Sequence, residues 1–191
     1  HEQAVARFSA AMGEEHPALA ILRNNLGIAL KNAGQLPRGL EQYQRALAIW
    51  EEALGPDNPK VANALNNIAV VLELQGDLEG ALAQHQRALA IRRAALAADH
   101  TKISESQVNL GALILKMKRY PEALANYRSA LAIDEKVLGS EHPDLGDELT
   151  GLGIIHTRLG APESALPLLE RALRVRSKAP ENRSSLWEAS F

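Results

Sequence analysis

Apolar residues follow a helical period through most of the chain. Between residues 17 and 33 they recur at steps of three and four residues, at Leu19, Leu22, Leu26, Ala29 and Leu30. This spacing is typical of one face of an amphipathic α-helix. Gly34 ends the segment, Pro37 fits the first turn of a second helix, and the apolar pattern then continues to Leu54. The pattern therefore predicts a helical hairpin.

The hairpin pattern recurs every 42 residues with no insertion. An apolar–small pair marks each first helix, at Leu26-Gly27, Ile68-Ala69, Leu110-Gly111 and Leu152-Gly153. A second signature marks each second helix, at 45–49, 87–91, 129–133 and 171–175. Four copies at one fixed period predict four stacked repeats, at 16–57, 58–99, 100–141 and 142–178.

Small residues recur where the two helices of each repeat should meet. On the second helix they are Gly39, Ala81, Ala123 and Ala165 and, about two turns further on, Ala46, Ala88, Ala130 and Ala172. Small side chains allow two helix backbones to approach closely. We therefore predict that these residues form the tight contact with the small residue of each apolar–small pair.

The repeated residues resemble a known family. Leu26-Gly27, Gly34, Leu36, Tyr43 and Ala46 resemble the tetratricopeptide repeat (TPR), and the 42-residue length resembles the variety found in kinesin light chains and many bacterial proteins. The resemblance covers roughly residues 16–178. It implies an all-α fold, a right-handed α-solenoid of stacked helical hairpins (the TPR superhelix). It also implies a non-catalytic protein–protein interaction scaffold that binds an extended peptide or partner segment in its concave groove.

The resemblance also indicates which residues line that groove. In the family, the groove is lined by first-helix positions just before and after the apolar–small pair. The candidate peptide-binding residues are Asn24, Ile28, Lys31, Asn63, Asn66, Val70, Lys116 and Arg158. Amides both donate and accept hydrogen bonds, so Asn24 and Asn66 are expected to hold a peptide main chain. Internal hydrogen bonds are the alternative, and we expect them instead for Asn25, Asn67 and Asn109.

The other groove positions predict the kind of ligand. Ile28, Val70, Ala112 and Ile154 provide an apolar floor. Lys31, Lys116 and Arg158 favour an acidic or C-terminal peptide, because guanidinium and ammonium groups pair with carboxylates. Glu73, Glu105 and Asp147 weaken that preference.

Nothing in the sequence predicts an enzyme or a cofactor. Three histidines occupy equivalent positions at the repeat joints, His16, His100 and His142. Equivalent positions lie at least one helix diameter of about 10 Å apart, too far to share a metal ion, so we expect these side chains to cap or pack at the joints. His85 occupies the position of Tyr43 and Tyr127 and is predicted to be a packing residue. Adjacent carboxylates such as Asp134-Glu135 are expected on a solvated helix face.

Composition and the chain ends complete the picture. The net charge of -2, the absence of cysteine and the lack of a run of about 20 apolar residues argue against nucleic-acid, disulfide and membrane-spanning roles, and a cytoplasmic location is expected. Residues 1–15 align with the second helix of a preceding repeat, which predicts further chain upstream. Residues 179–191 form a tail in which Trp187 and Phe191 either cap the last hairpin or mediate weak self-association.

Two other functions fit the same repeats. The chain is either a structural module that builds oligomers or the sensor segment of a larger regulatory protein. A mass measurement in solution separates the oligomerisation module from the peptide-binding scaffold.

Overall fold

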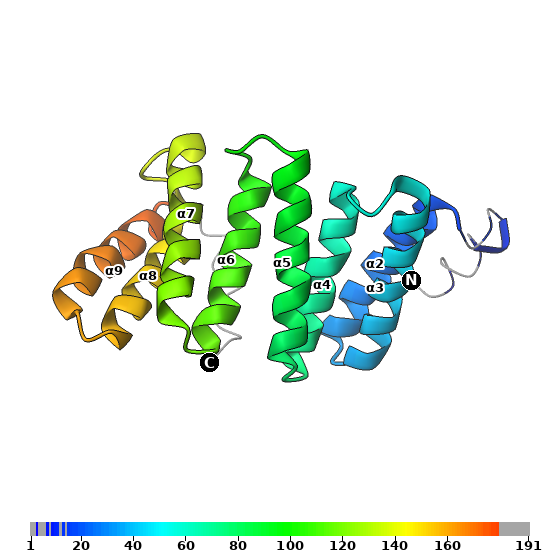
Figure 1. The fold of residues 1–191 in the computed structure, drawn as a ribbon, viewed down its shortest axis with the longest axis horizontal. Coiled ribbons are helices and arrows are strands. Elements are labelled where there is room, and N and C mark those ends of the chain that lie inside the picture. The colour runs from blue at the N-terminus through cyan, green and yellow to red at the C-terminus, as the bar shows by residue number, and fades with distance from the viewer. Residues whose placement is uncertain (1–2, 4–6, 8, 12, 14, 180–191) are drawn as a thin grey trace. The chain divides into compact units, whose positions relative to one another are not determined.

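The computed structural model describes residues 3, 7, 9–11, 13 and 15–179 of the chain (Figure 1). They form two compact units, unit 1 up to Ala98 and unit 2 from Asp99 onwards. The expectations for Trp187 and Phe191 lie outside the described residues, as does much of the half repeat expected at residues 1–15. Gly13 is described, and its φ of 90° matches that of Gly139, which the repeat alignment places at the same position.

From Pro17 onwards, unit 1 forms two helical hairpins. The first pairs α2 (Pro17–Asn32) with α3 (Leu36–Leu54), and the second pairs α4 (Pro59–Leu74) with α5 (Leu78–Ala95). Helix α3 also packs on α4, which joins the two hairpins. The core between them contains Trp50, Val61, Ala64 and Ile91.

Unit 2 repeats this plan. Helix α6 (Thr101–Lys116) pairs with α7 (Tyr120–Leu138), and α8 (Gly146–Arg158) pairs with α9 (Pro162–Arg176). A short 3-10 helix, η1 (Pro143–Leu145), precedes α8, and both α6 and α7 contact α8. Within the described residues there is no strand, so the predicted all-α fold of stacked helical hairpins is confirmed.

The joint histidines cap helices, as the sequence predicts. The Nδ1 atom of His16 accepts a hydrogen bond from the Ala18 N–H group at 3.2 Å, and His100 and His142 do the same two residues further along at 3.1 and 3.2 Å. Asn58 holds the equivalent position and uses its Oδ1 atom, 3.0 Å from the Lys60 nitrogen. Each side chain satisfies one of the N–H groups that a helix start leaves without an intrahelical partner.

The turn inside each hairpin has one conformation in all four repeats. Gly34, Gly76 and Gly160 have φ values of 73°, 86° and 75°. Lys118 stands at the same position with φ of 61°, the only described residue other than glycine with a positive φ. A side chain is disfavoured in this left-handed region, so Lys118 is held there at a cost of roughly 1 kcal/mol.

The predicted close helix contact is confirmed in the first repeat. A Cβ atom on Gly27 would lie 2.6 Å from the Tyr43 ring, and one on Gly39 would lie 3.2 Å from the Gly27 carbonyl oxygen. The aligned alanines of the second helices are all buried, at 46, 88, 130 and 172. His85 is buried at the repeat position of Tyr43, as expected. Its repeat has the larger residue Ala69 where the first repeat has Gly27, so the smaller histidine ring stands in the repeat that has less room for a ring.

Candidate binding surface

Asn24 and Asn67 join the first helices of unit 1. The Asn67 amide nitrogen on α4 donates to Asn24 Oδ1 on α2 at 2.8 Å, and both side chains are half-buried. The internal role expected of Asn67 is therefore confirmed. Asn24 already has an internal partner, and a peptide main chain would have to use the rest of its amide.

The other two candidate amides of unit 1 also have internal partners. Asn66 is only 7% exposed, and its Oδ1 atom lies 2.8 Å from Nδ1 of His85. Burial, reinforced by the nearby Arg92 charge, lowers the pKa of His85 to about 4, so the ring is neutral at pH 7 and its N–H group donates. Asn63 is exposed and accepts from Nη2 of Arg92 at 2.9 Å. Peptide contact by these amides stays a prediction.

The apolar candidates of unit 1 differ in accessibility. Ile28 is 38% exposed, and Ile21 lies two turns earlier on the same helix with 45% of its surface exposed. Lys31 and Val70 are half-buried. Helix α2 therefore presents apolar surface that its own hairpin does not cover.

In unit 2 the packing brings Lys116 and Arg158 to one recess of about 410 Å³. Lys116 ends α6 and Arg158 ends α8, and the turn residue Lys118 also lines the recess. Its other lining residues are Leu115, Tyr120 and Ile154. We name this site the basic recess. It offers cationic groups beside apolar walls, an arrangement suited to a carboxylate on a peptide chain.

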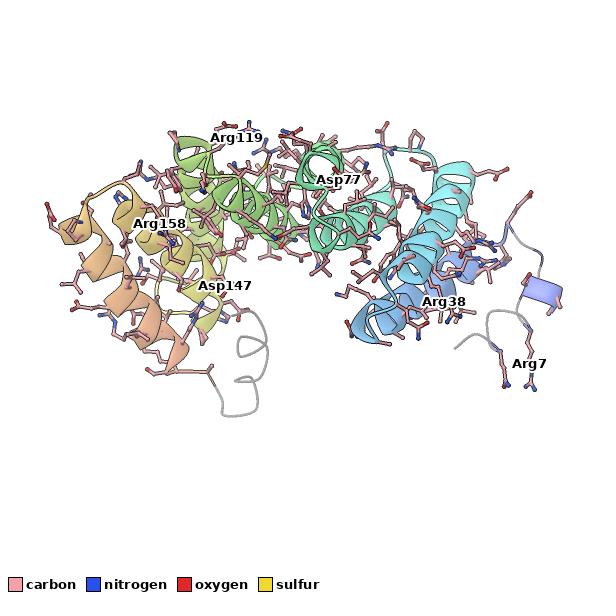
Figure 2. The ribbon with its side chains drawn as sticks, turned by 90° about the horizontal axis from the view of Figure 1, so that it is seen from below. Arg7, Arg38, Asp77, Arg119, Asp147 and Arg158 are labelled. Atoms are coloured by element: carbon pink, nitrogen blue, oxygen red, sulfur yellow. The ribbon has the colours of Figure 1, made fainter. Side chains whose placement is uncertain are left out.

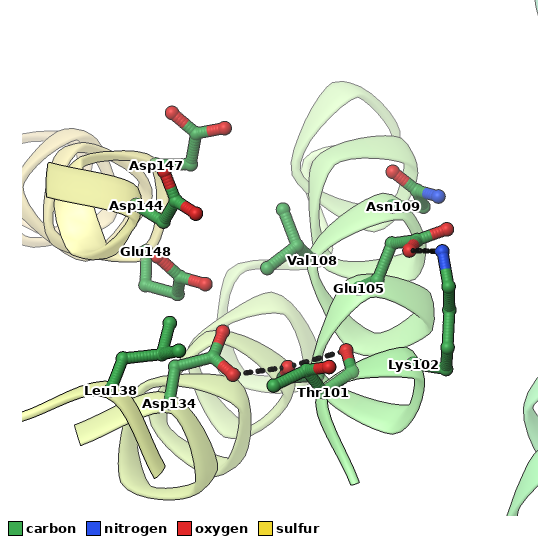
Figure 3. Close-up of a pocket in the computed structure, with 11 residues that line it drawn as sticks. Thr101, Lys102, Glu105, Val108, Asn109, Asp134, Leu138, Asp144, Asp147 and Glu148 are labelled. Atoms are coloured by element: carbon green, nitrogen blue, oxygen red, sulfur yellow. Dashed lines mark hydrogen bonds and ion pairs between the residues drawn. The ribbon is translucent and has the colours of Figure 1, made fainter. Parts of the chain in front are cut away.

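A second recess of about 390 Å³ lies towards the opposite ends of the same first helices, where sequence analysis did not place a site. Figure 2 shows Arg158 and Asp147 near the two ends of α8. Asp134 and Glu148 line this recess with Ser104, Val108 and Leu138, and its remaining lining residues are Thr101, Lys102, Glu105, Asn109, Asp144 and Asp147 (Figure 3). We name it the acidic recess.

The expectation that Asp134 lies on a solvated face is wrong. Asp134 is 7% exposed, and its Oδ1 atom accepts a 2.5 Å hydrogen bond from the Ser104 hydroxyl group. The repeat alignment contained the signal, because Asp134 matches the core residue Trp50 while Glu135 matches Glu51. Comparing it with its own repeat position, rather than with its neighbour in sequence, would have predicted burial.

Glu148 is the most perturbed acid in the described part of unit 2. Its side chain is 3% exposed, and its Oε2 atom has no hydrogen-bond partner among the described residues. Burial, with the adjacent carboxyl groups of Asp134 and Asp147, raises the pKa of Glu148 to about 8. At neutral pH the carboxyl group is mostly protonated.

Metal and membrane sites were also sought in the part of the chain that the structure describes. No group of three or more His, Cys, Asp or Glu side chains there is arranged to hold a metal ion. None of the helices from α2 to α9 combines the length and the apolar composition needed to cross a bilayer.

Solved structures show the same fold. BtubC (BKLC) from P. vanneervenii is 25% identical with a TM-score of 0.78, and the match covers 85% of this chain and 65% of that one. The nearly identical TPR-like repeats of a Podosopora anserina putative kinesin light chain are 24% identical, with a TM-score of 0.77, and the match covers 93% of this chain and 84% of that one. The apo form of RapI is 22% identical, with a TM-score of 0.74 and coverage of 83% and 56%.

The sequence comparisons identify the family. None of the curated proteins matches the chain. The tetratricopeptide repeat family model, however, matches residues 22–94 and 102–178. Such repeats generally act as protein-interaction scaffolds rather than catalysts. Because these two matches cover most of its length, the chain belongs to the tetratricopeptide repeat family.

Proposed function

We propose that the chain binds an extended segment of a partner protein and holds a carboxylate group of that segment in the basic recess. The observation that supports this most is the convergence of Lys116 and Lys118 of the α6–α7 hairpin with Arg158 of the next hairpin. Arg158 and Lys118 have no ion-pair partner among the described residues, whereas Arg171 and Arg176 of the same unit are paired with acids. Cations without partners beside apolar walls suit a carboxylate ligand.

The backbone of Lys118 supports the same site. The first, second and fourth repeats have glycine at this turn. The third repeat instead has Lys118 with a strained backbone, and the side chain of this lysine lines the recess. Local strain of this kind persists where the side chain has another use. The apolar residues Leu115 and Ile154 would then contact the side chains that precede the carboxylate.

Selection from a displayed library of random peptides with free C-terminal carboxylates tests the proposal. Arg158→Glu should weaken the selected peptides roughly tenfold or more, because it replaces the bidentate cation by a repelling charge. Arg128→Glu, at an exposed position on α7, is the matched control and should change affinity by less than about twofold. Selected peptides that bind both variants equally would exclude the basic recess as their site.

Lys118→Gly separates binding from stability. Removing the strained side chain should stabilise the protein by roughly 1 kcal/mol in urea unfolding. The same change should weaken the selected peptides by about threefold or more, because one cation of the recess is lost. A lower free energy of unfolding in the variant, or an unchanged affinity for the peptides, would contradict the role given to Lys118.

An oligomerisation module is the second candidate. It is favoured by Leu166 and Leu173 on α9, which are 59% and 71% exposed. Sedimentation equilibrium of the wild type and of Leu173→Glu tests it: a wild-type dimer that the substitution dissociates would support oligomerisation over peptide binding.

A further inference from the structure

Unit 1 shows that the fold does not require acids at the position of the acidic recess. The residues aligned with Asp134 and Glu148 are Trp50 and Ala64, which lie together in the apolar core of unit 1. Ser104 likewise aligns with the buried Ala62. Burying carboxyl groups costs stability unless they are fully paired. Unit 2 therefore carries a costly arrangement that stacking of the hairpins does not explain.

The acids face a space. Figure 3 shows the Glu148 carboxyl group of α8 directed away from its own helix, with the Asp134 carboxyl group of α7 next to it and Val108 of α6 across from it. The Oε2 atom of Glu148 has no hydrogen-bond partner among the described residues although the residue is only 3% exposed, so the packing leaves a buried polar atom of the recess unsatisfied. Val108 and Leu138 add apolar wall.

We infer that the acidic recess binds a basic side chain, lysine or arginine, of the partner segment whose carboxylate lies in the basic recess. The inference rests on the proposed function. The aliphatic part of the basic side chain would lie along Val108 and Leu138, and its cationic group would donate to Glu148 Oε2 and to Asp134. Such charge-assisted hydrogen bonds are stronger than neutral ones.

The two recesses set the spacing of the two ligand groups. Glu105 lies at the acidic recess and Lys116 at the basic recess, both on α6. Eleven residues of α-helix span about 16 Å. An extended peptide covers that length in about five residues. The segment therefore carries its basic residue about five positions before its carboxylate.

Binding should also release a proton. The free protein holds a proton on Glu148 at neutral pH, because its pKa is raised to about 8. A ligand cation favours the ionised carboxylate, so affinity should rise from about pH 6.5 to about pH 8.5. The charged groups around Glu148 are Asp134 on α7, Asp144 on η1, and the two ion pairs Lys102–Glu105 on α6 and Arg176–Asp147 between α9 and α8.

The direct test titrates the full chain with N-acetyl-lysine amide while two-dimensional NMR records its amide signals. A saturable shift should centre on Ser104, Val108 and Glu148, and N-acetyl-norleucine amide, which lacks the charge, should not produce it. N-acetyl-arginine amide tells whether the recess accepts both cations or lysine alone. No saturable shift with either cation, or an equal shift with norleucine, would overturn the inference.

Variants locate the binding. Asp134→Asn combined with Glu148→Gln should lower the affinity for N-acetyl-lysine amide roughly fivefold or more and abolish the pH dependence of that affinity. Glu170→Gln, at an exposed position on α9, should leave both unchanged. Because amides can destabilise this site, the unfolding curve of the double variant is recorded beside its titration, and Asp134→Asn alone serves if the double variant unfolds. Equal affinity in the acid variants and the wild type would refute the site.

The outcomes separate this inference from the proposed function. Arg158→Glu should weaken the binding of the selected peptides while changing the affinity for N-acetyl-lysine amide by less than about twofold. If the lysine probe does not bind but the selected peptides still depend on Arg158, the acidic recess is not a ligand site and the proposed function stands. If the probe binds but selected peptides ignore Arg158, the proposed function fails, and with it the two-group ligand.

Discussion

The joint between hairpins is built differently in the two units. In unit 1, Trp50 and Ala64 contribute to a buried apolar core, whereas the aligned residues of unit 2, Asp134 and Glu148, line a recess. Both joints connect a second helix to the next first helix at the same repeat position. The repeat therefore tolerates either chemistry here, and the apolar version is the one that packing alone would favour.

The polar first-helix residues show a parallel difference. In unit 1 the amides of Asn24, Asn63 and Asn66 each pair with another side chain of the unit. In unit 2 the slot of Asn24 and Asn66 holds Val108 and Thr150, and Val108 forms a wall of the acidic recess. All three amides of unit 1 therefore have internal partners, and the Asn24–Asn67 pair links its two hairpins. In unit 2 we propose that the acidic recess beside Val108 takes a ligand group instead. Exchanging residues for their counterparts one or more repeats away tests this comparison.

The largest effect is expected from Trp50→Asp, which gives unit 1 the acid of unit 2. The substitution removes a buried indole and places a carboxylate without a hydroxyl partner, because Ala62 stands where Ser104 stands in unit 2. We expect a loss of about 4 kcal/mol or more in urea unfolding. Gln44→Asp, at an exposed position on α3, should cost less than about 1 kcal/mol. A small loss for Trp50→Asp would show that the two joints are interchangeable.

The next effect concerns the aromatic position of the second helices. Tyrosine at 43 lies over Gly27 and tyrosine at 127 lies over Gly111, but His85 accompanies Ala69. His85→Tyr should therefore overpack the ring against the Ala69 methyl group and cost roughly 1–3 kcal/mol. Adding Ala69→Gly should recover part of that loss. Additive losses in the two substitutions, measured by thermal unfolding, would contradict this explanation.

Glu148→Gln tests the raised pKa of this buried acid of unit 2 through the pH dependence of the free energy of unfolding. Because the folded pKa of Glu148 is raised from 4.5 to about 8, the folded state holds the proton more tightly than the unfolded chain. Its contribution to stability is complete below about pH 4.5 and is lost as pH rises towards about 8. Glutamine removes this dependence, so the variant should gain on the order of 1–3 kcal/mol relative to wild type between about pH 5 and about pH 8.5. Parallel stability–pH curves for the two proteins would rule out the raised pKa.

The smallest effect concerns the caps. His100→Asn copies the Asn58 cap of unit 1 into unit 2 and should change the free energy of unfolding by less than about 0.5 kcal/mol. His100→Ala removes the acceptor and should cost about 1 kcal/mol. Equal stability of the asparagine and alanine variants would mean that the Nδ1 contact does not stabilise α6.

Much of the fold could be predicted from the sequence. The apolar period and the turn glycines predicted the hairpins. The small residues predicted the contact between Gly27 and Gly39, and the repeated joint histidines predicted the caps. These features depend on interactions between residues close in sequence or on a repeat position whose role is visible four times over. Local geometry and the fixed period were sufficient to specify them.

Tertiary packing decided which polar residues have internal partners and which line a recess. Asn24 meets Asn67, Ser104 meets Asp134, and Lys116 shares a recess with Arg158, each pair about 30 to 43 residues apart. The sequence placed candidate residues on helix faces. Whether a residue at such a position is buried, paired or accessible depends on the residues that neighbouring helices bring to it, because a side chain's surroundings form only when the hairpins pack.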